Sequence, residues 1–178
     1  MRSHATIGPV TLAALLVLTT LVTAPHAWAA GRHAKPAPRA TGAPIVIEDP
    51  DAPVPDSSLV QTDALAAQLK DTKHAKPFLV HVGFKRLYRG GHIPDSPYAG
   101  PTSEPEGIAA LTKTLTSVPR TQAIVLYCGC CPWEHCPNVR PAYHRARAMG
   151  FTRVKVLRID HDLQRDWAEK GFPVKDGE

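Results

Sequence analysis

Short apolar runs alternate with stretches of helical character from Ser57 onward, and this alternation predicts the secondary structure. Unbroken apolar runs are typical of buried strands, and four stretches fit: "SLV" at 58–60, "PFLVHVGF" at 77–84, "AIVLYC" at 123–128 and "RVKVLRI" at 153–159. Helices are predicted for "DALAAQLK" at 63–70, "GIAALTKTLTS" at 107–117, the stretch 138–150 and "DLQRDWAEKG" at 162–171. Strands that alternate with helices predict one α/β domain with a parallel sheet.

The helix ends are marked by residues that commonly stand there. Thr62 is predicted to cap the first helix and Asn138 the third, since short polar side chains satisfy the free N–H groups of a first turn. Pro141 is tolerated in that first turn, and Gly150 is a suitable helix end.

The chain before residue 57 differs in composition from the rest. Residues 1–29 show the order of a signal peptide, with one arginine, the apolar run "TLAALLVLTTLVTA" and small residues before a cleavage site after Ala29. Residues 30–56 are rich in proline and alanine, which predicts an extended tether that a partner protein could bind, with 45–47 as a docking point. We therefore expect residues 57–178 to form the folded domain of an exported protein, periplasmic or secreted, with no stable membrane span after cleavage.

The charge pattern argues against a nucleic-acid partner. The whole chain has a formal charge of +5, and several basic residues lie in the predicted tether. No basic stripe is interleaved with aromatic residues, as a nucleic-acid surface would require. We expect a moderately basic soluble surface.

All four cysteines lie within one loop, at positions 128, 130, 131 and 136, with His135 beside the last. The loop joins a predicted buried strand to a predicted helix. A cysteine at this position faces the unpaired N–H groups and the positive dipole end of the helix, which favour a reactive thiolate. An exported protein also meets conditions that permit disulfides.

Four stretches in order resemble a single-domain rhodanese, a thiosulfate sulfurtransferase-like module. They are "FLVHVGFKRLYRGGHIPDS", "IVLYC", "NVRPAYHRARAMGF" and "VKVLRIDHDLQRDWAEKGFPV", and the likeness spans about residues 57–176. The resemblance implies a parallel sheet of about five strands with helices on both faces. The chain departs from the family pattern at two places. His81-Val82-Gly83 stands where the family usually has Asp-Val-Arg, and His161-Asp162 stands where it usually has Gly-Gly after the last strand.

The resemblance also implies an activity. Cys128 stands in the position of the nucleophile that holds a persulfide, and Arg140 in the position of the active-loop arginine. An arginine fork suits an oxyanion such as thiosulfate. The implied reaction passes sulfur from a small donor to a thiophilic acceptor and requires no cofactor. The interval from Cys128 to Arg140, twelve positions, is unusually long for the family.

The extra cysteines leave three interpretations open. Cys130, Cys131 or Cys136 could act as a resolving thiol toward Cys128, or pairs of cysteines could form structural disulfides. A bridge between the adjacent Cys130 and Cys131 would be strained, which favours Cys136 as the partner of either. Alternatively, Cys130, Cys131, His135 and Cys136, with or without Cys128, form a copper or zinc site in a non-catalytic or redox protein.

Other residues near these motifs have plainer interpretations. His81 is expected to be a hydrogen-bonded core histidine, His92 to pack within a turn, and Trp167 to lie in the core. Trp133 is a loop aromatic that could shield the site, and Glu134 could orient His135.

Overall fold

The computed structural model of the chain describes residue 49 and residues 52–177. The predicted signal peptide with its cleavage site, most of the predicted tether and its docking point at 45–47 lie outside the described residues. Within the described part of the chain, no helix combines the length and apolarity needed to cross a membrane.

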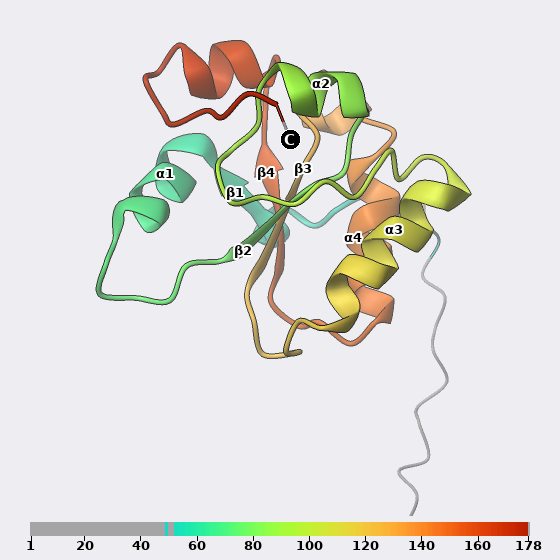
Figure 1. Ribbon diagram of the computed structural model, residues 1–178. Helices are drawn as coiled ribbons and strands as arrows, with labels where there is room; N and C mark the ends of the chain where they lie inside the picture. The colour runs from blue at the N-terminus through green and yellow to red at the C-terminus, as the bar shows by residue number, and fades with distance from the viewer. Residues whose placement is uncertain (1–48, 50–51, 178) are drawn as a thin grey trace, which may run out of the picture. The chain divides into compact units, whose positions relative to one another are not determined.

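A four-stranded parallel sheet forms the centre of the domain, in the order β1-β4-β3-β2 (Figure 1). The strands are β1 (Leu59–Gln61), β2 (Phe78–His81), β3 (Ile124–Tyr127) and β4 (Val154–Arg158). The four apolar runs of the sequence thus form the four strands. All residues of β3 are buried, because this central strand is covered on both faces.

Alternate residues of β3 point to two separate hydrophobic cores. Ile124 and Leu126 belong to the core under α3 (Pro105–Thr116) and α4 (Val139–Ala148). Val125 and Tyr127 belong to the core that includes residues of α1 (Thr62–Lys70) and of the π-helical turn η3 (Gln164–Ala168). The expected α/β fold with helices on both faces is confirmed.

The sheet has fewer strands than the expected five or so. Tyr98 makes an isolated parallel bridge to His81 at the edge of β2, in which the His81 N–H donates to the Pro97 carbonyl and the Ala99 N–H donates to the His81 carbonyl. Pro97 and Pro101 flank this segment and have no N–H to donate to a neighbouring strand. The fifth strand is therefore reduced to a single bridge.

Two predicted helix caps are wrong in detail. Helix α1 begins at Thr62 itself, and its preceding residue Gln61 makes no side-chain cap; the Thr62 hydroxyl instead accepts a hydrogen bond from Lys170. Asn138 does precede α4, but its side chain does not cap the helix. Gly150 follows α4 with a φ of +88°, the left-handed backbone expected at a helix end.

Helix α2 (Lys85–Gly90) and the carboxyl-terminal segment lie beside each other at one end of the sheet (Figure 1). His92, just after α2, pairs through its backbone with Lys175. Its ring stacks on Tyr88 with centroids 3.8 Å apart, and its Nδ1 bonds the Tyr88 carbonyl. His92 therefore has the packing role expected of it, and Trp167 is fully buried as predicted.

Candidate functional site

Cys128 directly follows β3 at the carboxyl end of the sheet, where it is 2% exposed. The loop after it contains the short 3-10 helix η2 (Trp133–His135) and leads into α4. Gly129 has a φ of +80°, and a side chain there would begin 2.8 Å from the Leu163 Cβ. The strand-to-helix loop thus starts with a tight turn that only glycine accommodates without strain.

The sulfur atoms of this loop form a cluster. Cys130 Sγ lies 3.2 Å from Cys128 Sγ, 3.0 Å from Cys131 Sγ and 3.9 Å from Cys136 Sγ. All four cysteines are free thiols, and these separations exceed the roughly 2.05 Å of a disulfide bond. The loop is held by packing and hydrogen bonds in this structure, with its sulfurs close enough to react with one another.

Three of the thiols can converge on one metal ion. The sulfur atoms of Cys128, Cys130 and Cys136 all lie within 4.8 Å of one another. Cys131 is outside this set, and His135 is exposed on η2. The sulfur cluster therefore differs from the ligand set expected from the sequence, because it includes Cys128 and excludes the imidazole.

The negative charge of the cluster is favoured at Cys136. Hydrogen bonds from Cys128 and Cys130 lower the pKa of the Cys136 thiol far below its ordinary value, and the backbone N–H groups of Asn138 and Val139 add to this effect. At Cys128 a hydrogen bond with Cys130 lowers the pKa, but the interaction with Cys136 and burial outweigh it and raise the pKa overall. The two neighbouring thiols, with the start of α4 as a smaller cause, thus lower the pKa of Cys136, whereas the sequence pattern pointed to Cys128 as the thiolate.

The Cys130 thiol also holds its proton firmly. Its hydrogen bonds with Cys128 and Cys136, followed by burial, raise its pKa. For Cys131, burial comes first and the hydrogen bond with Cys130 second, and both raise the pKa. The reduced cluster therefore carries one favoured thiolate surrounded by thiol donors.

Asn138 supports the site in a way that sequence reasoning missed. Its side-chain Nδ2 donates toward Cys128 Sγ at 3.6 Å, and its side-chain Oδ1 accepts the N–H of Ser103 at 3.0 Å. The residue is fully buried. Its place before the helix suggested a cap, and only the folded loop reveals that its side chain faces the sulfur.

Arg140 lies on the first turn of α4 but does not line the pocket at Cys128. Its Nη2 donates to the backbone carbonyl of Glu134 at 2.6 Å. The side chains of Glu134 and His135 are both exposed, and Trp133 packs against the core cluster that contains Cys128 and Cys136. In this structure the hydrogen bond of Arg140 links α4 to η2.

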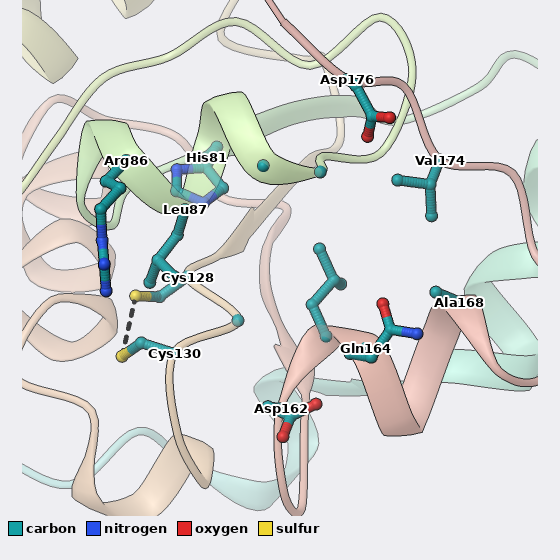
Figure 2. A pocket seen from close by; sticks show the side chains of 14 residues that line it. His81, Arg86, Leu87, Cys128, Cys130, Asp162, Gln164, Ala168, Val174 and Asp176 are labelled. Carbon is teal, nitrogen blue, oxygen red and sulfur yellow. Dashed lines mark hydrogen bonds between the residues drawn. The ribbon is translucent and has the colours of Figure 1, made fainter.

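A pocket of about 730 Å³ opens beside the sulfur cluster. Cys128 and Cys130 form part of its wall, and Arg86 of α2 also lines it. Figure 2 shows the Arg86 guanidinium directed toward the Cys128 sulfur, while Asp162 and Asp176 lie away from it. The sulfur end of the pocket therefore has a cation available to a small anion. Arg86 carried no distinguishing signal in the sequence, because α2 was not predicted.

His81 lies under the pocket as a buried neutral base. Its Nδ1 accepts the N–H of Gly83 at 3.2 Å, and its Nε2 has no hydrogen-bond partner among the described residues. Burial, reinforced by the charge of His92, lowers the His81 pKa to about 4. The ring packs edge-on against Tyr88 and Tyr127. The expected core position is confirmed, and His81 also reaches the pocket wall.

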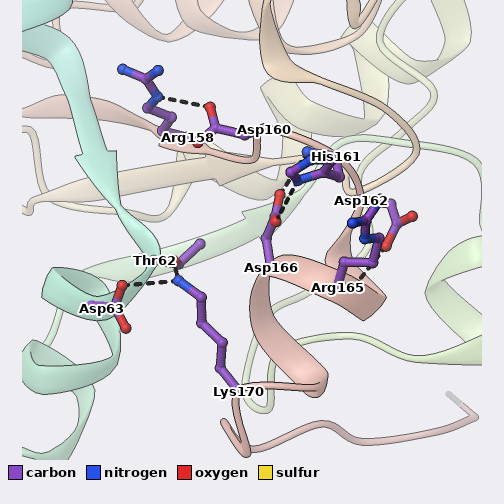
Figure 3. Close-up of polar contacts among 9 residues, drawn as sticks. All are labelled: Thr62, Asp63, Arg158, Asp160, His161, Asp162, Arg165, Asp166 and Lys170. Atoms are coloured by element: carbon purple, nitrogen blue, oxygen red, sulfur yellow. Dashed lines mark hydrogen bonds and ion pairs between the residues drawn. The ribbon is translucent and has the colours of Figure 1, made fainter.

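The far wall of the pocket is fixed by polar contacts around η3 (Figure 3). The N–H of His161 donates to Asp166 at 2.7 Å, and the Asp162 carboxylate accepts the N–H of Arg165 at 2.8 Å. Lys170 bonds to Asp63 at 2.9 Å, which links the segment after η3 to α1. The unusual His161-Asp162 pair therefore shapes the turn that leads into η3.

No family model and no curated protein matches the sequence. Solved structures match its fold. The crystal structure of the BH2092 protein from Bacillus halodurans aligns with a TM-score of 0.53 and 20% identity, over 67% of this chain and 77% of that chain. The rhodanese-like domain of the Alr3790 protein from Anabaena sp. aligns with a TM-score of 0.50 and 19% identity, over 67% of this chain and 79% of that domain. A crystal structure of Alr3790 gives a TM-score of 0.51 at 17% identity, over 66% and 82%.

These likenesses, together with the parallel sheet, define the fold. The chain has a single-domain rhodanese-like fold. At such identities the likeness concerns the fold, and function must be argued from the site.

Proposed function

We propose that the chain is an exported rhodanese-like sulfurtransferase that carries sulfane sulfur as a persulfide on Cys128. The observation that carries this proposal is the position of Cys128, at the carboxyl end of β3 in the wall of a pocket of about 730 Å³. Ligands of open α/β sheets bind at this end. Export is supported by the signal-peptide pattern of residues 1–29.

Sulfur uptake follows from the chemistry of a thiolate that faces a pocket with a cation, Arg86, in its wall. The Cys128 thiolate attacks the outer sulfur of thiosulfate, a Cys128 S–S bond forms, and sulfite leaves with the electron pair of the broken S–S bond. The thiolate arises when the favoured charge on Cys136 moves to Cys128 by exchange of one proton within the cluster. Arg86 would bind the sulfonate end of the donor.

A persulfide formed this way can pass its outer sulfur to a thiophilic acceptor. The acceptor attacks the outer sulfur, and the Cys128 thiolate is regenerated as the leaving group. No cofactor takes part in either step. A partner protein bound through residues 30–56 would supply or receive the sulfur.

The test uses the reduced protein from residue 30 onward with thiosulfate and cyanide, and measures thiocyanate. We expect turnover by the unaltered chain and only the background rate for Cys128→Ser. Cys131→Ser is the matched control, because Cys131 lies in the same loop but outside the pocket wall, and it should retain turnover. Equal turnover by Cys128→Ser and the unaltered chain would exclude Cys128 as the sulfur carrier.

Binding of a thiophilic metal is the second candidate function, and the convergence of Cys128, Cys130 and Cys136 favours it. Three sulfurs bound to one ion at about 2.3 Å lie about 4 Å apart, so the observed spacing fits after small shifts. Soft thiolate ligands select Cu(I) or Zn(II). These residues would hold the ion in a non-catalytic rhodanese-like protein.

An anaerobic titration of the reduced chain with Cu(I) or Zn(II), against a competing chelator, tests this candidate. We expect one tightly bound ion per chain and weakened binding in Cys136→Ser, with Cys131→Ser and His135→Ala unchanged. Binding that depends on Cys131 and His135 instead would support the ligand set predicted from the sequence and contradict the three-sulfur site.

A further inference from the structure

Cys128 and Cys130 are the two cysteines that line the pocket, and their sulfur atoms lie 3.2 Å apart. Gly129 between them adopts a φ of +80°, and Leu163 fills the space that a side chain at 129 would need. The turn that brings the two sulfurs together is therefore fixed by its packing. Figure 2 shows both side chains on the same side of the loop.

Given the proposed sulfur-transfer function, we infer that Cys130 is a second catalytic cysteine that reduces the sulfur held on Cys128. Its sulfur attacks Cys128 Sγ within the persulfide and releases the outer sulfur as hydrosulfide. The substrate class is then a sulfane-sulfur donor together with an external dithiol, and the product is sulfide.

The step balances in atoms and electrons. A bond forms between Cys130 Sγ and Cys128 Sγ, and the bond between Cys128 Sγ and the outer sulfur breaks. The proton of the Cys130 thiol passes to the Cys136 thiolate, whose sulfur is 3.9 Å away, and the outer sulfur of the protonated persulfide leaves with the electron pair of the broken bond as hydrosulfide. The two cysteine sulfurs are oxidised to a disulfide and the sulfane sulfur is reduced. An external dithiol then reduces the disulfide by thiol–disulfide exchange.

The other two cysteines are less suited to this attack. Cys131 does not line the pocket and is outside the set of sulfurs, Cys128 among them, that lie within 4.8 Å of one another. Cys136 does not line the pocket either, although its sulfur lies within 4.8 Å of Cys128 Sγ. For Cys130 the two sulfurs need to approach from 3.2 Å to about 2 Å, which a change of side-chain torsion can supply.

The experiment is a single turnover under anaerobic conditions. Reduced, metal-free protein from residue 30 onward receives one equivalent of thiosulfate without added reductant or cyanide. Sulfite, sulfide, intact mass and the alkylation of each cysteine are then measured. We expect the unaltered chain to release one sulfite and one sulfide and to lose the Cys128 and Cys130 thiols together.

Variants separate this inference from the proposed function. Cys130→Ser should release sulfite but no sulfide and should gain the mass of one sulfur at Cys128, while Cys131→Ser should behave as the unaltered chain. Sulfite release with a stable persulfide in the unaltered chain would overturn the inference and leave the proposed function standing. Sulfide release by Cys130→Ser at the unaltered rate would also overturn it. Absence of both sulfite and sulfur uptake in the unaltered chain would overturn both.

Discussion

Gly83 and Cys128 lie in direct contact, so that a Cβ at position 83 would overlap the Cys128 sulfur. The resemblance to rhodaneses would place an arginine at this position, and the structure explains why it is absent. Arg86, on α2, instead directs its guanidinium into the pocket (Figure 2). Arg140, the arginine expected from the sequence, is engaged with the Glu134 carbonyl.

This placement predicts different effects for the two arginines. Arg86→Ala should raise the KM for thiosulfate about tenfold, because a charge-assisted hydrogen bond to an anion contributes about 1.5 kcal/mol at its lower limit. Arg140→Ala should lower the stability of the loop and leave KM nearly unchanged. Steady-state kinetics with thiosulfate and cyanide, beside thermal unfolding, measures both. A raised KM in Arg140→Ala and an unchanged KM in Arg86→Ala would restore Arg140 as the anion-binding residue.

At the scale of elements, the strand β3, the cysteine loop and the helix α4 form one unit. The sequence predicted the strand, the helix and the place of Cys128 between them, because apolar runs and helix ends follow from local patterns. It did not predict which sulfurs converge. That depends on the path of a long loop, in which the side chain of Asn138 turns toward Cys128 and His135 turns to solvent.

The edge of the sheet and helix α2 could not be predicted from local sequence patterns either. The fifth strand was expected from the resemblance, whereas Pro97 and Pro101 reduce it to one bridge. Helix α2 is six residues long and too short for a recognisable apolar period, so Arg86 could not be placed beside the cysteines in advance.

The turn at Gly129 sets the start of the cysteine loop, so a substitution there should change both stability and sulfur transfer. Gly129→Ala should cost about 1–2 kcal/mol for the left-handed backbone and about 1–3 kcal/mol more for overpacking against Leu163, and it should lower sulfur transfer per folded molecule. Gly171→Ala is a matched control, because Gly171 has a φ of +75° with nothing within 4 Å of its added Cβ. Urea unfolding and the thiocyanate assay measure the two effects.

The Gly171→Ala variant should lose only the stability that the left-handed backbone costs an alanine, and it should keep its sulfur-transfer activity. If the two variants lost the same stability and both kept full transfer, the packing of the cysteine turn against Leu163 would have no part in the activity.

At the scale of the whole molecule, His81 couples stability to pH. Its buried ring lies among aromatic residues, and burial, with the charge of His92 as a second cause, lowers its pKa from 6.5 to about 4. The unfolded chain therefore binds a proton between pH 6.5 and pH 4 that the folded chain does not. Stability from this residue is complete above pH 6.5 and declines as the pH falls through this window, by about 3 kcal/mol in all.

The measurement is the free energy of unfolding in urea at several values of pH between 4 and 7, for the unaltered reduced chain and for His81→Gln. Glutamine fills a similar volume and can accept the Gly83 N–H, but it does not titrate. Other groups, the Cys136 thiol among them, also contribute stability that declines as the pH falls, so the difference between the two proteins isolates His81. We expect the unaltered chain to lose about 3 kcal/mol more than the variant over this range. If the free energy of unfolding fell with pH equally in the two proteins, His81 would be protonated as readily in the folded chain as in the unfolded chain. Its protonated Nε2 would then need a hydrogen-bond acceptor that offsets the cost of burial.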